Sequence, residues 1–84
     1  MEAIATTKHG ATLILQMTGE LTLQSAPPVR KTMESILTDE TVTYVVLDME
    51  HLSFIDSSGI GMLVALKSRL ADTNKYLYLL KPPK

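Results

Sequence analysis

The chain has 84 residues, of which 45% are hydrophobic, and a formal net charge of −1 at pH 7, which suits one small globular domain over residues 1–84. Cysteine is absent, which excludes disulfides and thiolate chemistry and fits a cytoplasmic protein, and the mixed charge argues against a nucleic-acid partner. No apolar run approaches the roughly 20 residues of a membrane helix, and the N-terminus lacks a signal-peptide pattern, so we expect no direct membrane insertion.

The N-terminal part of the chain predicts a β-hairpin. Residues 3–8 are typical of a moderately polar strand suited to a sheet edge, and Gly10 supplies a tight turn because glycine accepts a positive φ without cost. Residues 11–18 alternate in character and predict a second strand. The apolar side chains that share one of its faces are Leu13, Leu15 and Met17.

A connection over residues 19–24 then leads to an amphipathic helix. Pro27 and Pro28 fit its first turn, because a proline's missing N–H would have no partner there. The apolar residues that recur at helical spacing are Val29, Met33, Ile36 and Leu37. The pattern stops at residues 38–40, so we expect one buried helix face.

The second half of the chain predicts a strand, a helix and a final strand. Residues 42–49 are apolar on both faces, which favours an interior strand covered from both sides. A loop over residues 50–53 leads to a helix from Ser57 or Ser58 to about Ala71, and residues 76–80 form the last strand. The order β-β-α-β-α-β indicates an α/β domain with a mixed β-sheet and helices packed on it.

The junction between the third strand and the second helix carries the polar residues of most interest. Asp56, Ser57 and Ser58 are all good N-cap residues, so capping is the simplest explanation for one of them. Gly59 and Gly61 each cost about 1 kcal/mol in a helix relative to Ala, which requires either close packing or close approach from outside. Capping with packing and a functional helix start are equally good explanations at this level. A hydroxyl at a helix N-terminus is a natural place for a phosphate.

Enzyme and metal functions find little support in the sequence. Ser57 lacks the Gly-x-Ser-x-Gly context of a hydrolase, and nothing places His9 or His51 near it as a base. The phosphate-loop pattern is absent, and residues 59–61 are too short for a dinucleotide fingerprint. The acidic residues are too scattered to suggest metal ligands. We therefore expect no catalytic residue, no metal and no cofactor.

Three segments give the chain a family resemblance, namely residues 15–21, 45–49 and 52–61. The chain resembles a STAS domain, the fold of bacterial anti-sigma-factor antagonists and of sulfate-transporter tails. The third segment is the most specific, because the family signature is Asp-Ser-Ser/Thr-Gly, then an aliphatic residue and Gly, which Asp56 to Gly61 match. The resemblance covers nearly the whole chain in order and spacing.

The resemblance implies a phosphorylation switch. In antagonists of this family the Ser after the Asp is phosphorylated by an anti-sigma factor with serine kinase activity, which makes Ser57 the modified residue and Ser58 the alternative. The unmodified protein binds the kinase and frees the sigma factor, the phosphorylated form releases it, and a phosphatase resets the switch. The implied partner-binding residues are Asp56, Ser57, Ser58, Gly59, Ile60, Gly61 and Thr22.

Three departures from the family pattern bear on this implication. Thr22 stands where the family often has Asp, and Pro27-Pro28 replaces a polar helix start. The family pattern also continues through a further helix, strand and helix, so one flank of the sheet would lack cover here. Either the domain is truncated, or a minimal version associates with itself as a homodimer.

Two other functions stay open at this point. The chain could be a STAS subunit of a membrane transport system, holding an ATPase or transporter without phosphotransfer. It could also be a sensor that binds a nucleotide or another anion at the helix start.

Overall fold

The computed structural model describes residues 3–81 as a mixed α/β domain, as the sequence predicted. The elements in chain order are β1 (Ala3–His9), β2 (Thr12–Leu21), the short 3₁₀ helix η1 (Leu23–Ser25), α1 (Ala26–Leu37), β3 (Tyr44–Asp48), β4 (Leu52–Ile55), α2 (Ser57–Asp72) and β5 (Tyr76–Leu80). The final strand has the predicted bounds, and α2 begins at one of the two predicted residues. The order therefore contains one strand more than the sequence pattern indicated.

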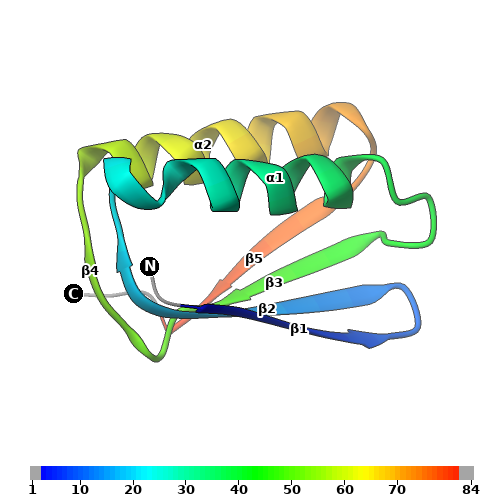
Figure 1. The fold of residues 1–84 in the computed structure, drawn as a ribbon. Helices are drawn as coiled ribbons and strands as arrows, with labels where there is room; N and C mark the ends of the chain where they lie inside the picture. Colours follow the sequence, from blue (N-terminus) through cyan, green and yellow to red (C-terminus); the bar gives the residue numbers. More distant parts are fainter. Residues whose placement is uncertain (1–2, 82–84) are drawn as a thin grey trace.

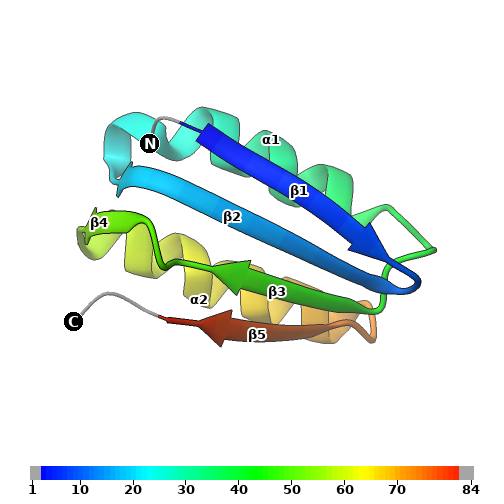
Figure 2. The same ribbon diagram turned by 90° about the horizontal axis from the view of Figure 1, so that it is seen from below.

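The strands form one mixed sheet with the order β1-β2-β3-β5 (Figure 2). β1 pairs antiparallel with β2 and lies at an edge, as expected for its polar character. β3 runs parallel to both β2 and β5. Residues 12–16 of β2 pair with β3, and residues 19–21 pair with β4. The same side of β2 thus pairs with two strands in succession.

Two strands extend into segments that were expected to be loops, which corrects the prediction. β2 continues to Leu21, inside the predicted connection over residues 19–24, and β4 begins at Leu52, inside the predicted loop over residues 50–53. Gly19 explains the change of partner, because its φ of 96° is accessible mainly to glycine and the register shifts between Gly19 and Glu20. The Gly19 N–H donates to the His51 carbonyl (3.2 Å), and the Ser53 hydroxyl donates to the Gly19 carbonyl (3.1 Å). These bonds hold β4 beside the end of β2.

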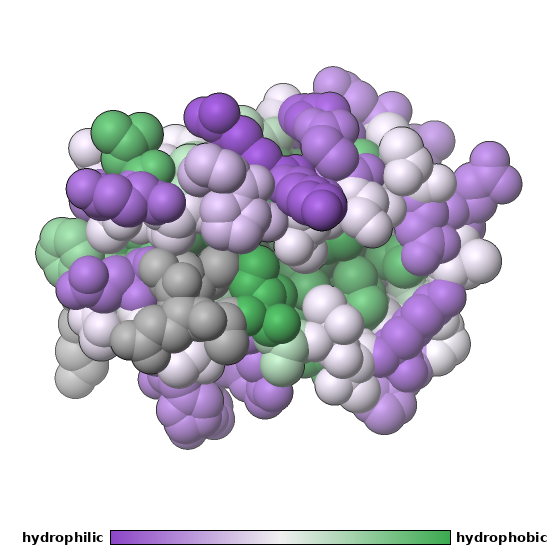
Figure 3. All heavy atoms as spheres, viewed as in Figure 1, coloured by the Kyte–Doolittle hydropathy of each residue, from purple (hydrophilic) through white to green (hydrophobic). Residues whose placement is uncertain are grey.

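The core lies between the sheet and the two helices, which cover the same face (Figure 1). The predicted stripe of α1 is confirmed, since Val29, Met33 and Ile36 are buried. The buried residues of α2 and of the sheet include Leu63, Leu66, Leu70, Leu15, Met17, Val45 and Leu47. In the same view, hydrophobic side chains are visible between the two layers and hydrophilic ones over the helices (Figure 3).

Among residues 3–81, both helices lie on one face of the sheet and none lies on the other, which corrects the expectation that β3 is covered from both sides (Figure 1). Val45 and Leu47 point into the core, whereas Tyr44 lies on the open face and is exposed. Its ring stacks on Tyr76 with centroids 5.8 Å apart and lies 6.4 Å from Tyr78. Aromatic residues can therefore occupy a strand face that no second layer covers. An apolar sequence pattern alone does not tell whether such a face is covered or open.

The flank of α2 beside β5 is apolar and exposed, as the comparison with the family pattern led us to expect. Ile60 and Val64 of α2 are 53% and 64% exposed, and Leu79 of β5 is 50% exposed. They surround a hollow of about 290 Å³, and β3 is the only strand that pairs with β5 among residues 3–81. This side of the molecule thus presents both an apolar surface and a strand edge.

Candidate functional site

Asp56 is the N-cap of α2. Its backbone is extended (φ −95°, ψ −179°), and its carboxylate accepts a hydrogen bond from the Gly59 N–H at 2.8 Å. The other carboxylate oxygen lies 3.4 Å from the Leu23 backbone nitrogen, and the Asp56 N–H donates to the Leu21 carbonyl at 3.2 Å. Capping therefore accounts for Asp56, and it also ties the start of α2 to the end of β2.

Capping does not account for the two serines that follow. Neither the Ser57 nor the Ser58 hydroxyl makes a hydrogen bond with any residue in the range 3–81. Ser57 is exposed, and Ser58 is half-buried. Both backbone N–H groups belong to the first turn, which has no intrahelical acceptors, so this helix start offers free donors beside two free hydroxyls. Such a site favours negative charge, whether carried by a ligand or by a covalent phosphate.

The two glycines of the signature have different structural reasons. A Cβ atom added to Gly59 would lie 2.5 Å from the Leu21 carbonyl oxygen and 2.7 Å from Ile55 Cγ1, so internal packing requires glycine there. A Cβ atom added to Gly61 would meet nothing within 4 Å. Of the two explanations that the sequence left open, close packing therefore applies to Gly59 and not to Gly61.

The remaining predicted contact residues lie on either side of this helix start. Leu21 pairs with Ile55 in the β2–β4 ladder, which brings Thr22 next to the start of α2. The Thr22 N–H donates to the Ser25 hydroxyl at 2.8 Å, and this hydroxyl donates to the Thr22 carbonyl at 2.9 Å. Ile60 faces the apolar flank beside β5. The fold thus brings all seven predicted residues together around one end of α2.

Three other features of residues 3–81 bear on the functions that the sequence left open. His9 pairs with Thr12 at the hairpin turn, which is the end of β2 far from Leu21 and the serines. Among residues 3–81, no three acidic or histidine side chains cluster as a metal ion would need. None of the helices in the same range is both long and apolar enough to cross a membrane.

The profile of the STAS domain family matches residues 3–84. The chain belongs to the STAS domain family. This STAS domain is 30% identical over 71 residues to the anti-sigma F factor antagonist of Lysinibacillus sphaericus, and the match covers 84% of this chain and 61% of that protein. It is 32% identical over 56 residues to the anti-sigma F factor antagonist of Paenibacillus polymyxa, with 67% of this chain and 48% of that protein covered. The chain thus spans less than two thirds of either relative.

The solved structures support the same relationship. The anti-sigma factor antagonist SpoIIAA in its unphosphorylated form superimposes with a TM-score of 0.81 at 25% identity, covering 98% of this chain and 76% of that one. The phosphorylated form of the Bacillus protein gives a TM-score of 0.79 at 26% identity, covering 95% and 73% of the two chains. The STAS domain is therefore similar to anti-sigma factor antagonists in both sequence and fold.

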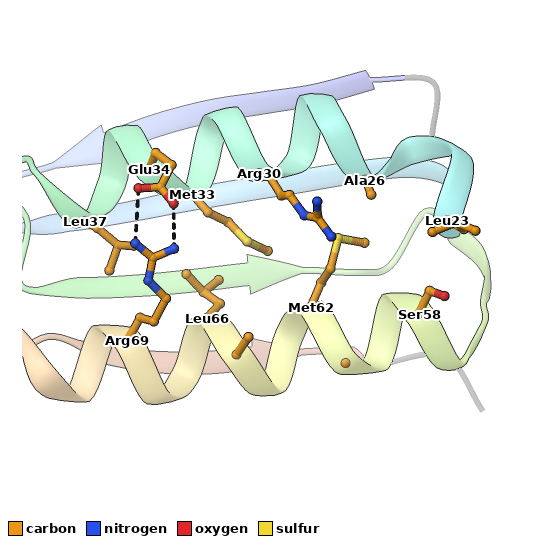
Figure 4. Close-up of a pocket in the computed structure, with 12 residues that line it drawn as sticks. Leu23, Ala26, Arg30, Met33, Glu34, Leu37, Ser58, Met62, Leu66 and Arg69 are labelled. Carbon is orange, nitrogen blue, oxygen red and sulfur yellow. Dashed lines mark hydrogen bonds and ion pairs between the residues drawn. The ribbon is translucent and has the colours of Figure 1, made fainter.

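The sequence interpretation missed a groove between α1 and α2 of the STAS domain (Figure 4). Its volume is about 360 Å³, and both Ser58 and Gly61 line it. At the far end, the Arg69 guanidinium of α2 donates to the Glu34 carboxylate of α1 at 2.5 and 3.1 Å, and this ion pair lowers the pKa of Glu34. Helical spacing places residues on a face, but the gap between two helices depends on how they pack, which local patterns do not give.

Proposed function

We propose that this STAS domain is an anti-sigma-factor antagonist that binds an anti-sigma factor with serine kinase activity and is switched off by phosphorylation of Ser57. The observation that carries the proposal is the free, exposed Ser57 hydroxyl in the first turn of α2, directly after the capping Asp56. The two antagonists from Lysinibacillus and Paenibacillus support it, as does a relative whose structure is known in a phosphorylated form.

Ser57 is a better acceptor than Ser58 because its side chain is more accessible. Ser57 is exposed, whereas Ser58 is half-buried and lines the groove between the helices. In the reaction the Ser57 oxygen attacks the γ-phosphorus of ATP, ADP leaves, and a base of the kinase takes the hydroxyl proton. The product carries about −1.5 to −2 additional charges at pH 7.

The phosphate would act through charge rather than through refolding. The first turn of α2 offers unpaired N–H groups that stabilise an anion, so the modified helix start keeps its geometry. Asp56 adjoins the phosphate, and the two together form a strongly negative surface. A partner surface that fits a neutral hydroxyl would be repelled, and a phosphatase would restore binding.

The experiment uses the purified anti-sigma F factor of Lysinibacillus sphaericus with ATP and Mg²⁺, followed by mass spectrometry of the intact chain and of its peptides. We expect one phosphate on the wild type and on Ser58→Ala, and none on Ser57→Ala. Binding to the same anti-sigma factor should be retained by Ser57→Ala and lost in Ser57→Asp. A chain that stays unmodified, or a Ser57→Asp variant that binds as well as Ser57→Ala, contradicts the proposal.

A further inference from the structure

The proposed phosphorylation of Ser57 does not use the groove between α1 and α2. This groove begins at Leu23 and Ser58, where both helices start, and ends at the ion pair between Glu34 and Arg69 (Figure 4). Its α2 side runs from Ser58 to Arg69, about 16 Å at the rise of an α-helix. The ion pair crosses the groove from one helix to the other and closes that end. The open half of the groove is therefore the one next to Ser57 and Ser58, at the start of α2.

The open half carries a charge without an internal partner. Arg30 of α1 extends toward Met62 of α2, and within residues 3–81 it makes no hydrogen bond or ion pair (Figure 4). The other arginine of the groove, Arg69, is paired with Glu34. Because a guanidinium binds a carboxylate through two parallel hydrogen bonds, Arg30 is suited to an acidic group from outside.

Apolar surface surrounds this arginine. Leu23 is 64% exposed at the mouth of the groove, and Ala26, Met62 and Ala65 line its walls. An exposed leucine beside a concave apolar surface and a single charge is typical of a site for one or two anchoring side chains. The groove therefore favours a segment that has both an apolar and an acidic residue.

Gly61 supplies an independent observation at the same place. A glycine in a helix costs about 1 kcal/mol relative to Ala, and internal packing does not require one at position 61. The residue lines the groove, where a side chain would occupy part of the open volume. The absence of a side chain leaves this part of the groove open to a group from another molecule.

We propose that the open half of the groove docks a segment of the partner protein that carries an apolar and an acidic side chain. The apolar side chain lies over Gly61 and against Leu23, and the carboxylate beside it pairs with Arg30. This inference rests on the proposed function, because it assigns the chemistry of the partner that the Ser57 switch controls. It also gives a reason for release, since a phosphate at this end of α2 would repel the partner's carboxylate.

The test selects phage-displayed random peptides on the full chain and on two charge-reversed variants. Arg30→Glu reverses the charge inside the groove, and Lys31→Glu makes the same change on the next residue, which does not line it. Peptides selected on the wild type and on Lys31→Glu should combine acidic and apolar residues. Those selected on Arg30→Glu should carry basic residues in place of the acidic ones.

The affinity of the best wild-type peptide is then measured for variants of the chain, which separates the contribution of Arg30 from that of the open space at Gly61. Arg30→Gln should weaken binding by about tenfold to hundredfold, the effect of losing a charged hydrogen bond. Gly61→Leu should weaken it at least as much because the side chain fills the groove, while circular dichroism confirms that this variant folds. Lys31→Gln is the matched control and should bind within about twofold of the wild type.

Three results would overturn the inference: no enriched motif on the wild type, the same motif on Arg30→Glu, or a best peptide that tolerates Gly61→Leu. The failure of the proposed function is recognised separately, because Ser57 phosphorylation is read by mass spectrometry. If Ser57 is phosphorylated but no acidic peptide is selected, the proposed function stands and the docking inference is wrong. If acidic peptides are selected but Ser57 is not phosphorylated, the docking inference stands and the proposed function is wrong.

Discussion

Replacing Gly59 by alanine tests whether the signature glycine is held by packing inside the domain. The new Cβ atom would lie 2.5 Å from the Leu21 carbonyl oxygen, 2.7 Å from Ile55 Cγ1 and 3.0 Å from Leu21 Cγ. The nearest of these atoms belongs to the backbone of β2 and cannot turn away as a side chain could. The start of α2 would have to move away from the sheet.

The size of the effect follows from two opposing contributions. Overpacking typically costs about 1–3 kcal/mol, and contact with a backbone atom places Gly59→Ala at the upper end of that range. Alanine recovers about 1 kcal/mol of helix propensity, which leaves a net loss of about 2 kcal/mol in the free energy of unfolding. Gly61→Ala makes the same chemical change in open space and should gain about 1 kcal/mol.

Thermal and urea unfolding, followed by far-ultraviolet circular dichroism, measure both variants. For a domain of this size, 1 kcal/mol shifts the Tm by about 4–8 °C, so Gly59→Ala should lower the Tm by about 8–16 °C. Gly61→Ala should raise it by about 4–8 °C. If Gly59→Ala unfolds at or above the wild-type temperature, internal packing is not the reason for this glycine.

Substitutions at three further positions test other contacts of the domain. Asp56→Ala should lower the free energy of unfolding by about 1 kcal/mol in urea titrations, whereas Asp56→Asn should retain most of the cap; equal losses would contradict the capping role. Lys75, buried between β5 and the loop before β3, donates to the Asp39 and Val42 carbonyls, so Lys75→Met should cost about 1.5–3 kcal/mol. Arg69 lowers the pKa of Glu34 from its ordinary 4.5, so the ion pair stabilises the fold above that pH and is lost as the pH falls through the lowered value. The Tm of Glu34→Gln should therefore fall less than that of the wild type on acidification, and parallel curves would refute this.

Local patterns were sufficient for most of the fold. Helical spacing identified Val29, Met33 and Ile36 as buried, and turn residues placed the hairpin and the last strand. β4 was missed because it is short, and its pairing with β2 depends on the positive φ of Gly19, more than thirty residues earlier. The open face of the sheet was missed because strand periodicity does not say whether a second layer exists.

The candidate site was predicted to a similar extent. The run from Asp56 to Gly61 identified the helix start, and the structure assigns the cap to Asp56 and the packing requirement to Gly59. Arg30 lies outside the apolar stripe that helical spacing predicts for its helix, so the sequence pattern did not single it out. Its place beside Met62 follows from the packing of α1 against α2, a relation between distant segments that helical spacing does not contain.

The tyrosine cluster on the open sheet face has a spectroscopic consequence. The chain has 3 tyrosines and no tryptophan, and all the tyrosines belong to this cluster on β3 and β5. Its intrinsic fluorescence therefore reports on one face of the sheet, opposite the helices and the serines. Events at the start of α2 should leave this emission unchanged, whereas separation of β5 from β3 should alter it. The same sample can thus report loss of the sheet edge by fluorescence and loss of the helices by circular dichroism.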